Sequence, residues 1–283
     1  MDGLLYLKEQ RTGLPRGELW YSGAVLAELG LAPAQESIVT LSYEIGADLC
    51  CLSYTNPVQQ LAIESPQMEL AINKAHALQL LCGVAVDGPF ERTVKAQGFA
   101  ETMKLFYQED RLAGLLNQHA EAAAAELAAA EKAGADWLIL CDDIAYSRGL
   151  YFSPAKFQSN LGPLYQKLRH AAKKTVMGFH SDGNVAAILN LLIDQGYSFF
   201  SLEPEAMDLV VLSRALPEQI TLLSGIKAQW LMQPNYNFAE NKQEILDYIA
   251  SLSTGCNLII ASLCGIANMA GLNNLKQLYG MFS

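Results

Sequence analysis

The sequence alternates short apolar runs with helical segments, and this alternation limits its possible folds more than any other feature. Each run ends in polar or glycine-rich residues, and a stretch with helical patterning follows. Eight strand–helix repeats of this kind predict a single (β/α)8 TIM barrel of the α/β class. The eight predicted strands are Gly17–Tyr21, Ala47–Tyr54, Leu81–Val86, Trp137–Cys141, Val176–Phe179, Phe199–Leu202, Thr221–Ser224 and Leu258–Ser262.

The length of 283 residues suits one barrel domain over residues 1–283, because this fold typically takes roughly 250 residues. A membrane span needs an apolar run of about 18 residues or more, and the sequence has none. The first residues lack the basic and apolar regions of a signal peptide. The six cysteines show no spacing typical of a disulfide scaffold, so we expect a cytoplasmic protein with reduced thiols.

The formal net charge of −10 argues against a nucleic-acid partner, since phosphates require a basic patch. The same imbalance disfavours a site that must hold many substrate carboxylates at once. We therefore expect a small-molecule substrate, and neither a nucleic acid nor a membrane as partner.

His180 is the one histidine of four that stands at the end of a predicted strand. The carboxyl ends of barrel strands carry the chemistry, so its imidazole is a candidate metal ligand or proton carrier. The alternative is a hydrogen-bonded structural residue. Asp182 points the same way if the chain stays extended, because side chains two residues apart share one face. Asn184 is a candidate for substrate binding or, alternatively, the cap of the next helix.

Asp142 and Asp143 form a second polar signal, at the end of the fourth predicted strand. Adjacent side chains on an extended segment point to opposite sides. One should face the barrel mouth, and the other should bind backbone amides of the following loop. Paired carboxylates at a strand end suit proton transfer or metal binding. Further acidic residues at the ends of other predicted strands would extend this pair to an acidic ring around the barrel mouth. The catalytic candidates are Asp142, Asp143, Asp87 and Glu18, and the substrate-binding candidates are Glu203, Tyr146 and Asn184.

Cys264 follows the last predicted strand, whereas Cys256 precedes it and should lie at the opposite end of the barrel. His180, Cys264 and a carboxylate such as Asp182 would form a zinc site, because catalytic zinc takes three protein ligands of these types and keeps one open position. The alternative for Cys264 is a buried thiol. The sequence contains no dinucleotide fingerprint, phosphate loop or GxSxG nucleophile elbow.

Several of these segments together resemble the uroporphyrinogen decarboxylase superfamily. The resemblance spans roughly residues 15–280, is most specific over 134–209, and implies a (β/α)8 barrel. The segments that carry it are Gly134–Asp136, Asp142-Asp143, Leu150–Pro154, His180–Val185, Ser201–Pro204 and Met207–Leu209.

The resemblance implies two chemistries. True uroporphyrinogen decarboxylases need no cofactor and hold the carboxylates of a tetrapyrrole with N-terminal arginines, but Leu14–Trp20 carries Glu18 in the corresponding place. The other branch resembles methyltransferases that work with corrinoid proteins and hold zinc with a His-x-Cys pair and a later cysteine. His180 and Cys264 match two of these ligands, and Asp182 replaces the middle cysteine.

We therefore expect a zinc-assisted methyltransferase that acts with a corrinoid carried by a partner protein and with a small-molecule methyl donor or acceptor. The resemblance also implies pairing as a homodimer. Two alternatives remain at this stage. One is a cofactor-free uroporphyrinogen decarboxylase, and the other is a non-catalytic barrel that binds a small molecule or a corrinoid domain.

Overall fold

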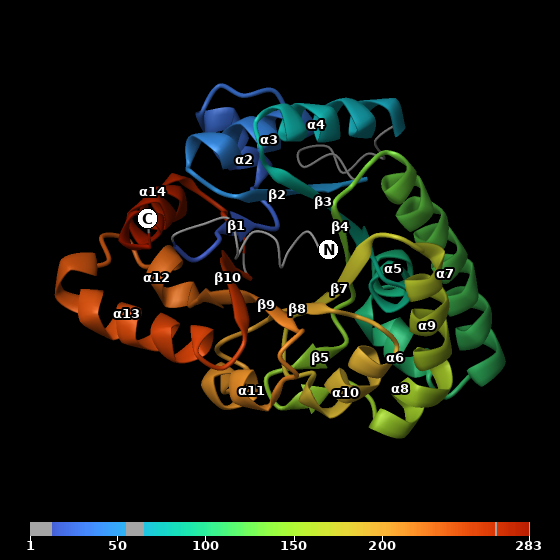
Figure 1. Ribbon diagram of the computed structural model, residues 1–283. Coiled ribbons are helices and arrows are strands. Elements are labelled where there is room, and N and C mark those ends of the chain that lie inside the picture. The colour runs from blue at the N-terminus through green and yellow to red at the C-terminus, as the bar shows by residue number, and fades with distance from the viewer. Residues whose placement is uncertain (1–12, 55–64, 264, 283) are drawn as a thin grey trace.

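The computed structural model describes residues 13–54, 65–263 and 265–282. Eight parallel strands form a ring, and the helices surround it in chain order (Figure 1). Each predicted apolar run overlaps one strand, which confirms the (β/α)8 barrel. The strands, in order around the sheet, are β1 (Gly17–Glu18), β2 (Leu49–Ser53), β3 (Leu81–Asp87), β4 (Trp137–Cys141), β7 (Val176–Ser181), β8 (Phe199–Leu202), β9 (Thr221–Ile226) and β10 (Asn257–Ser262).

The helices follow the predicted alternation, and none of those described is long and apolar enough to cross a membrane. Their bounds are α2 (Gly23–Glu28), α3 (Gln35–Glu44), α4 (Ser65–Ala77), α5 (Pro89–Gln97), α6 (Phe99–Leu105), α7 (Glu109–Lys132), α8 (Pro154–Asn160), α9 (Gly162–Ala171), α10 (Leu189–Asp194), α11 (Leu209–Ala215), α12 (Ala228–Met232), α13 (Phe238–Ser253) and α14 (Met269–Met281).

Two local features interrupt the simple alternation of strands and helices. The helical stretch that follows the fourth barrel strand is divided into α8 and α9 at Leu161. A proline lies at the start of α9, where its missing N–H and fixed φ favour the first turn of a new helix over a helix interior. The loop predicted after Asp143 contains a short hairpin, formed by β5 (Ala145–Tyr146) and β6 (Gly149–Leu150).

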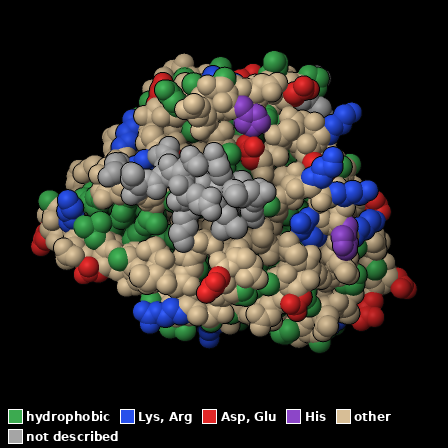
Figure 2. Space-filling model, viewed as in Figure 1, with side chains coloured by type: hydrophobic (Ala, Val, Ile, Leu, Met, Phe, Trp, Pro, Cys, Tyr) green, Lys and Arg blue, Asp and Glu red, His purple; other side chains and the backbone are tan. Residues whose placement is uncertain are grey.

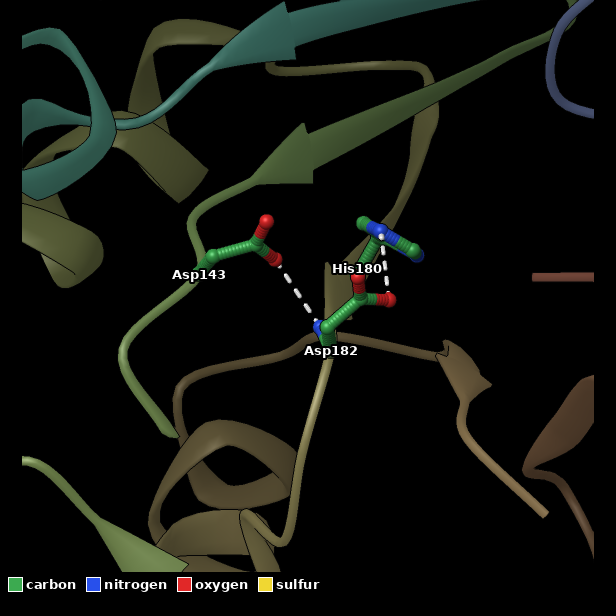
Figure 3. A group of neighbouring side chains, drawn as sticks. All are labelled: Asp143, His180 and Asp182. Atoms are coloured by element: carbon green, nitrogen blue, oxygen red, sulfur yellow. Dashed lines mark hydrogen bonds and ion pairs between the residues drawn. The ribbon is translucent and has the colours of Figure 1, made fainter. Parts of the chain in front are cut away.

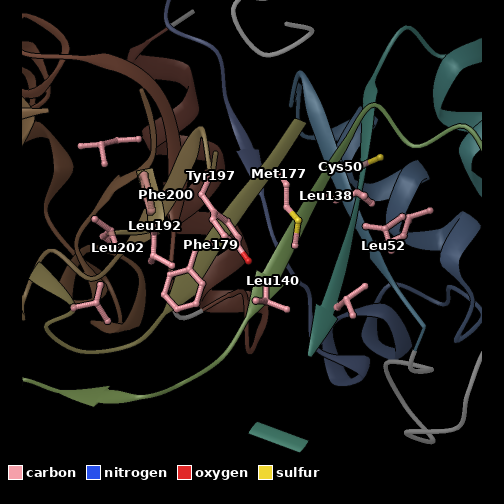
Figure 4. Close-up of a cluster of buried hydrophobic side chains, with 14 of the residues drawn as sticks. Cys50, Leu52, Leu138, Leu140, Met177, Phe179, Leu192, Tyr197, Phe200 and Leu202 are labelled. Carbon is pink, nitrogen blue, oxygen red and sulfur yellow. The ribbon is translucent and has the colours of Figure 1, made fainter. Parts of the chain in front are cut away.

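Two apolar layers stabilise the barrel. Side chains on the outer faces of the strands pack under the helices, as Figure 4 shows for Leu140, Phe179 and Leu202. A smaller cluster fills the interior. There, glycines on one set of strands make room for large side chains on their neighbours. The pairs are Gly17 with Leu49, Gly83 with Trp137, and Gly178 with Phe199.

Replacement of Gly83 by alanine should destabilise the barrel by about 1–3 kcal/mol, because the added Cβ would overlap the buried ring of Trp137. Gly114 provides a matched control, since it lies inside α7 with open space around it. Gly114→Ala should raise stability by about 0.5–1 kcal/mol through helix propensity. Denaturant unfolding of both variants measures the difference, and equal effects would contradict this account of the interior.

The barrel closes between β1 and β10 with the help of a side chain. Isolated bridges pair Arg16 with Ile260 and Tyr21 with Ile266. Between them, the carboxyl group of Glu18 accepts a hydrogen bond of 3.1 Å from the backbone N–H of Ser262. Glu18 therefore links the two strands where a backbone ladder bond would otherwise do so.

The side of the barrel covered by α7 and α9 has surface charges of both signs. In Figure 2, basic side chains gather on this side, and acidic side chains lie among them. Lys167 of α9 pairs with Glu121 of α7. Basic charge on this side is thus partly neutralised by its neighbours.

Candidate functional site

A cavity of about 820 Å³ lies at the carboxyl ends of the strands. Four residues predicted from the sequence line it, namely Asp87, Asp143, His180 and Asp182. The structure thus brings together side chains that come from β3 and from the segments at the ends of β4 and β7. The other lining residues include Trp20, Tyr54, Glu91, Arg92, Lys95, Glu126 and Cys141.

His180 is held in one orientation inside the barrel. It is only 3% exposed, and its Nδ1 lies 3.1 Å from the hydroxyl oxygen of Ser201 on β8. The ring of Trp20 packs against it in a T-shaped contact, with centroids 4.8 Å apart. Burial lowers the pKa of His180 to about 4, so the imidazole is neutral near pH 7. When Nδ1–H donates to Ser201, a lone pair remains on Nε2.

Asp143 and Asp182 lie beside this imidazole (Figure 3). The Oδ1 atom of Asp143 accepts a 2.9 Å hydrogen bond from the backbone N–H of Asp182, and Oδ1 of Asp182 lies 3.8 Å from Nε2 of His180. One ligand atom from each of the three residues lies within 4.8 Å of the others, an arrangement compatible with a bound metal ion. Burial, together with the charges of Asp143 and Glu203, raises the pKa of Asp182 to about 7.

Asp142 points away from the cavity and orients α5. Its carboxylate accepts hydrogen bonds from the backbone N–H groups of Phe90 and Glu91, at 3.2 and 2.5 Å, and from the hydroxyl of Tyr165 at 2.6 Å. Burial raises its pKa to about 7. These amides belong to the first turn of α5, not to the loop after Asp143 as predicted. Asp142 thereby positions a helix that contributes Glu91, Arg92 and Lys95 to the cavity wall.

The basic side chains of the cavity already have acidic partners. The Lys95 ammonium lies 2.7 Å from Asp87 and 3.4 Å from Glu91, and Arg92 pairs with Glu126. Sequence reasoning did not single out Arg92 and Lys95. A signal was nevertheless present, because residues three apart on a helix that follows Asp87-Gly88-Pro89 share one face.

Three further candidates surround the turn after β7 and do not line the cavity. Glu203 accepts a 2.8 Å hydrogen bond from the N–H of Gly183. The side chain of Asn184 accepts one from the N–H of Ala186, although the N-cap of the short helix that begins there is Val185. Tyr146 is 45% exposed and stacks on Tyr151. Their substrate-binding role stays a prediction.

Glu18 lies outside the cavity, in the wall between β1, β10 and α14. It is fully buried and binds the backbone and hydroxyl of Ser262 and the hydroxyl of Tyr279. Burial raises its pKa to about 8, so the carboxyl group is mostly protonated at pH 7. We expect a structural role for this residue. Cys264, the remaining candidate, lies outside the described residues.

The fold and the cavity define a class of protein, namely a TIM barrel with ionisable side chains gathered at the carboxyl ends of its strands. The family model for uroporphyrinogen decarboxylase (URO-D) matches residues 69–281, which is more than half of the chain. The chain belongs to this family. A search of curated proteins found no match to the sequence.

Solved structures of similar shape share the fold at low sequence identity. A sugar phosphate isomerase/epimerase from Parabacteroides distasonis has a TM-score of 0.55 at 13% identity, over 94% of this chain and 97% of that one. An endo-1,4-β-D-mannanase from Thermotoga petrophila has a TM-score of 0.53 at 10% identity, over 95% and 100%. A β-mannanase from Mytilus edulis has a TM-score of 0.51 at 8% identity, over 94% and 90%. These likenesses show the barrel fold alone.

Proposed function

We propose that this protein is a metal-assisted methyltransferase that moves a methyl group to or from a corrinoid carried by a partner protein. The observation that carries the proposal is the position of His180. Its neutral, buried imidazole presents Nε2 to the cavity beside the carboxylates of Asp143 and Asp182. Within the family, the methyltransferase branch is the one that the sequence resemblance associates with a metal site.

The charge of the cavity favours this branch over tetrapyrrole decarboxylation. Arg16, the only arginine of the segment 14–20, is buried against Asp48 and the backbone oxygen of Tyr279. Arg92 and Lys95 are paired with carboxylates. Every cationic side chain among the described lining residues thus has a carboxylate partner. A substrate with eight carboxylates would meet a mainly acidic cavity wall, and Coulomb repulsion would oppose its binding.

The donor set fits zinc, which accepts imidazole nitrogen and carboxylate oxygen and keeps an open position for substrate in catalytic sites. His180 and Asp182 would hold the ion. When bound, zinc would lower the pKa of a thiol or polarise an oxygen that carries the methyl group. Asp87 lies on the same cavity wall, where its carboxylate would orient the substrate or exchange a proton with it.

The test is a methyl-transfer assay with a methylated corrinoid and a thiol acceptor, beside metal analysis of the purified protein. We expect about one metal ion per chain, loss of transfer after chelation, and recovery on addition of zinc. Uroporphyrinogen turnover by the metal-free protein would overturn the proposal in favour of the decarboxylase. Binding of a corrinoid protein without any methyl transfer would favour a non-catalytic barrel.

A further inference from the structure

We propose that Asp143 joins His180 and Asp182 in a divalent metal site that needs no thiolate ligand. The inference deepens the proposed function and rests on it for the chemistry, but it rests on the geometry of these three side chains for the ligands. It departs from the set implied by the sequence resemblance, in which Cys264 is the third ligand.

His180 is held in the orientation that a metal ligand at this cavity would need. The residue is 97% buried, since only 3% of its surface is exposed, and Nδ1 is engaged by Ser201 at 3.1 Å. The other ring nitrogen, Nε2, lies 3.8 Å from Oδ1 of Asp182, and the residue lines the cavity. Metal-binding histidines are held in the same way, with one ring nitrogen hydrogen-bonded so that the other can face the ion.

The carboxylate of Asp143 is oriented by a contact that leaves one oxygen available. Its Oδ1 accepts the N–H of Asp182 at 2.9 Å. The other oxygen can therefore bind an ion while the first keeps the side chain in place. The same hydrogen bond ties the segments that follow β4 and β7 together, so it holds the Asp143 side chain next to the backbone of Asp182.

The turn after Asp182 fixes its backbone. Gly183 has a φ of +84°, and a Cβ at this position would collide with the backbone of Ala145 in the hairpin. Its N–H donates to Glu203 at 2.8 Å. Both the backbone angle and the close approach require a glycine at position 183. The turn therefore fixes the backbone of Asp182 at the cavity, while the side chain of Asp182 can still adjust.

The spacing of the three ligand atoms suits closure around an ion. Bond lengths of about 2.0–2.2 Å place tetrahedral ligand atoms about 3.4 Å apart. The observed separations are 3.8 Å between Nε2 and the Asp182 oxygen, and at most 4.8 Å within the group. The Asp182 side chain is 59% exposed and can make the remaining movement. One nitrogen and two carboxylate oxygens suit Zn²⁺, Co²⁺ or Mn²⁺ without a soft thiolate.

The experiment is a Co²⁺ titration of the full-length, chelator-treated protein, followed by visible absorption and calorimetry in the absence of substrates. We expect one Co²⁺ per chain and no cobalt–thiolate charge-transfer band in the near ultraviolet. Asp143→Asn and Asp143→Ala should both weaken Co²⁺ binding by at least about 10-fold, whereas Cys264→Ser should change it by less than about 2-fold. Glu91→Gln is the matched control, because it removes a carboxylate of the same cavity that is not a proposed ligand.

Melting temperatures of all variants separate loss of metal from loss of fold. A thiolate band, or loss of Co²⁺ binding in Cys264→Ser, would overturn the inference, as would undiminished binding by both Asp143 variants or equal losses in Glu91→Gln. Failure of the proposed function has a different signature. In that case Co²⁺ binds with the expected variant pattern, but no methyl transfer occurs with any corrinoid.

Discussion

Replacement of His180 by alanine should abolish metal binding and, with it, methyl transfer. The residue supplies the one nitrogen ligand of the proposed site and is fixed by Ser201. Even the contacts behind a metal ligand typically account for about 10–100-fold in affinity, so loss of the ligand itself should cost more than about 100-fold. Elemental analysis and the methyl-transfer rate, measured on the same preparation, provide the readout.

Two companion variants make this result specific. His170→Ala removes an exposed histidine on α9 and should leave both metal content and transfer unchanged. Ser201→Ala removes only the orienting contact and should weaken metal binding by about 10-fold. A His180→Ala protein that still contains one ion per chain would show that the metal is bound elsewhere.

Replacement of Glu18 by glutamine should remove part of the pH dependence of stability. The pKa of Glu18 is raised from 4.5 to about 8, chiefly by burial, so the folded protein binds this proton more tightly than the unfolded chain. The contribution of protonated Glu18 to the free energy of unfolding is therefore complete below about pH 4.5 and is lost as the pH rises towards 8. Over this range, wild type should lose about 1.4 kcal/mol per pH unit relative to the glutamine variant.

Denaturant unfolding between pH 5 and pH 9 measures this difference. Glutamine mimics the protonated acid and keeps contacts to Ser262 and Tyr279. Glu18→Ala loses these contacts and should be less stable than the glutamine variant by about 2–4 kcal/mol at every pH. If the wild-type and glutamine curves run parallel, Glu18 is ionised in the folded protein, and the proposed protonated link between β1 and β10 is wrong.

The strands of this barrel could be predicted because their signal is local. A buried parallel strand is a short apolar run bounded by turn residues, and β4 (Trp137–Cys141) and β8 (Phe199–Leu202) begin and end where the sequence predicts. Helix interruptions are harder to predict. The division between α8 and α9 depends on the Gly162-Pro163 pair at the start of α9. The spacing of apolar residues does not predict it.

The positions of site residues could be predicted only where the two-residue repeat of an extended strand decides which face a side chain occupies. His180 and Asp182 are two residues apart on one extended segment, so the shared face followed from the sequence. The choice between Asp142 and Asp143 did not follow, because either could face the mouth. Glu18 was predicted to extend the group of acidic residues at the barrel mouth, but β1 directs its side chain outwards to Tyr279.

The sequence alone determined the alternation of strands and helices and the polar residues at the strand ends, because both arise from side-chain periodicities within a few residues. The tertiary structure alone decided which carboxylates meet. Asp143 reaches the imidazole of His180 because β4 and β7 are adjacent in the barrel with Cys141 opposite His180. That register is set by packing across the whole sheet, and no local pattern contains it.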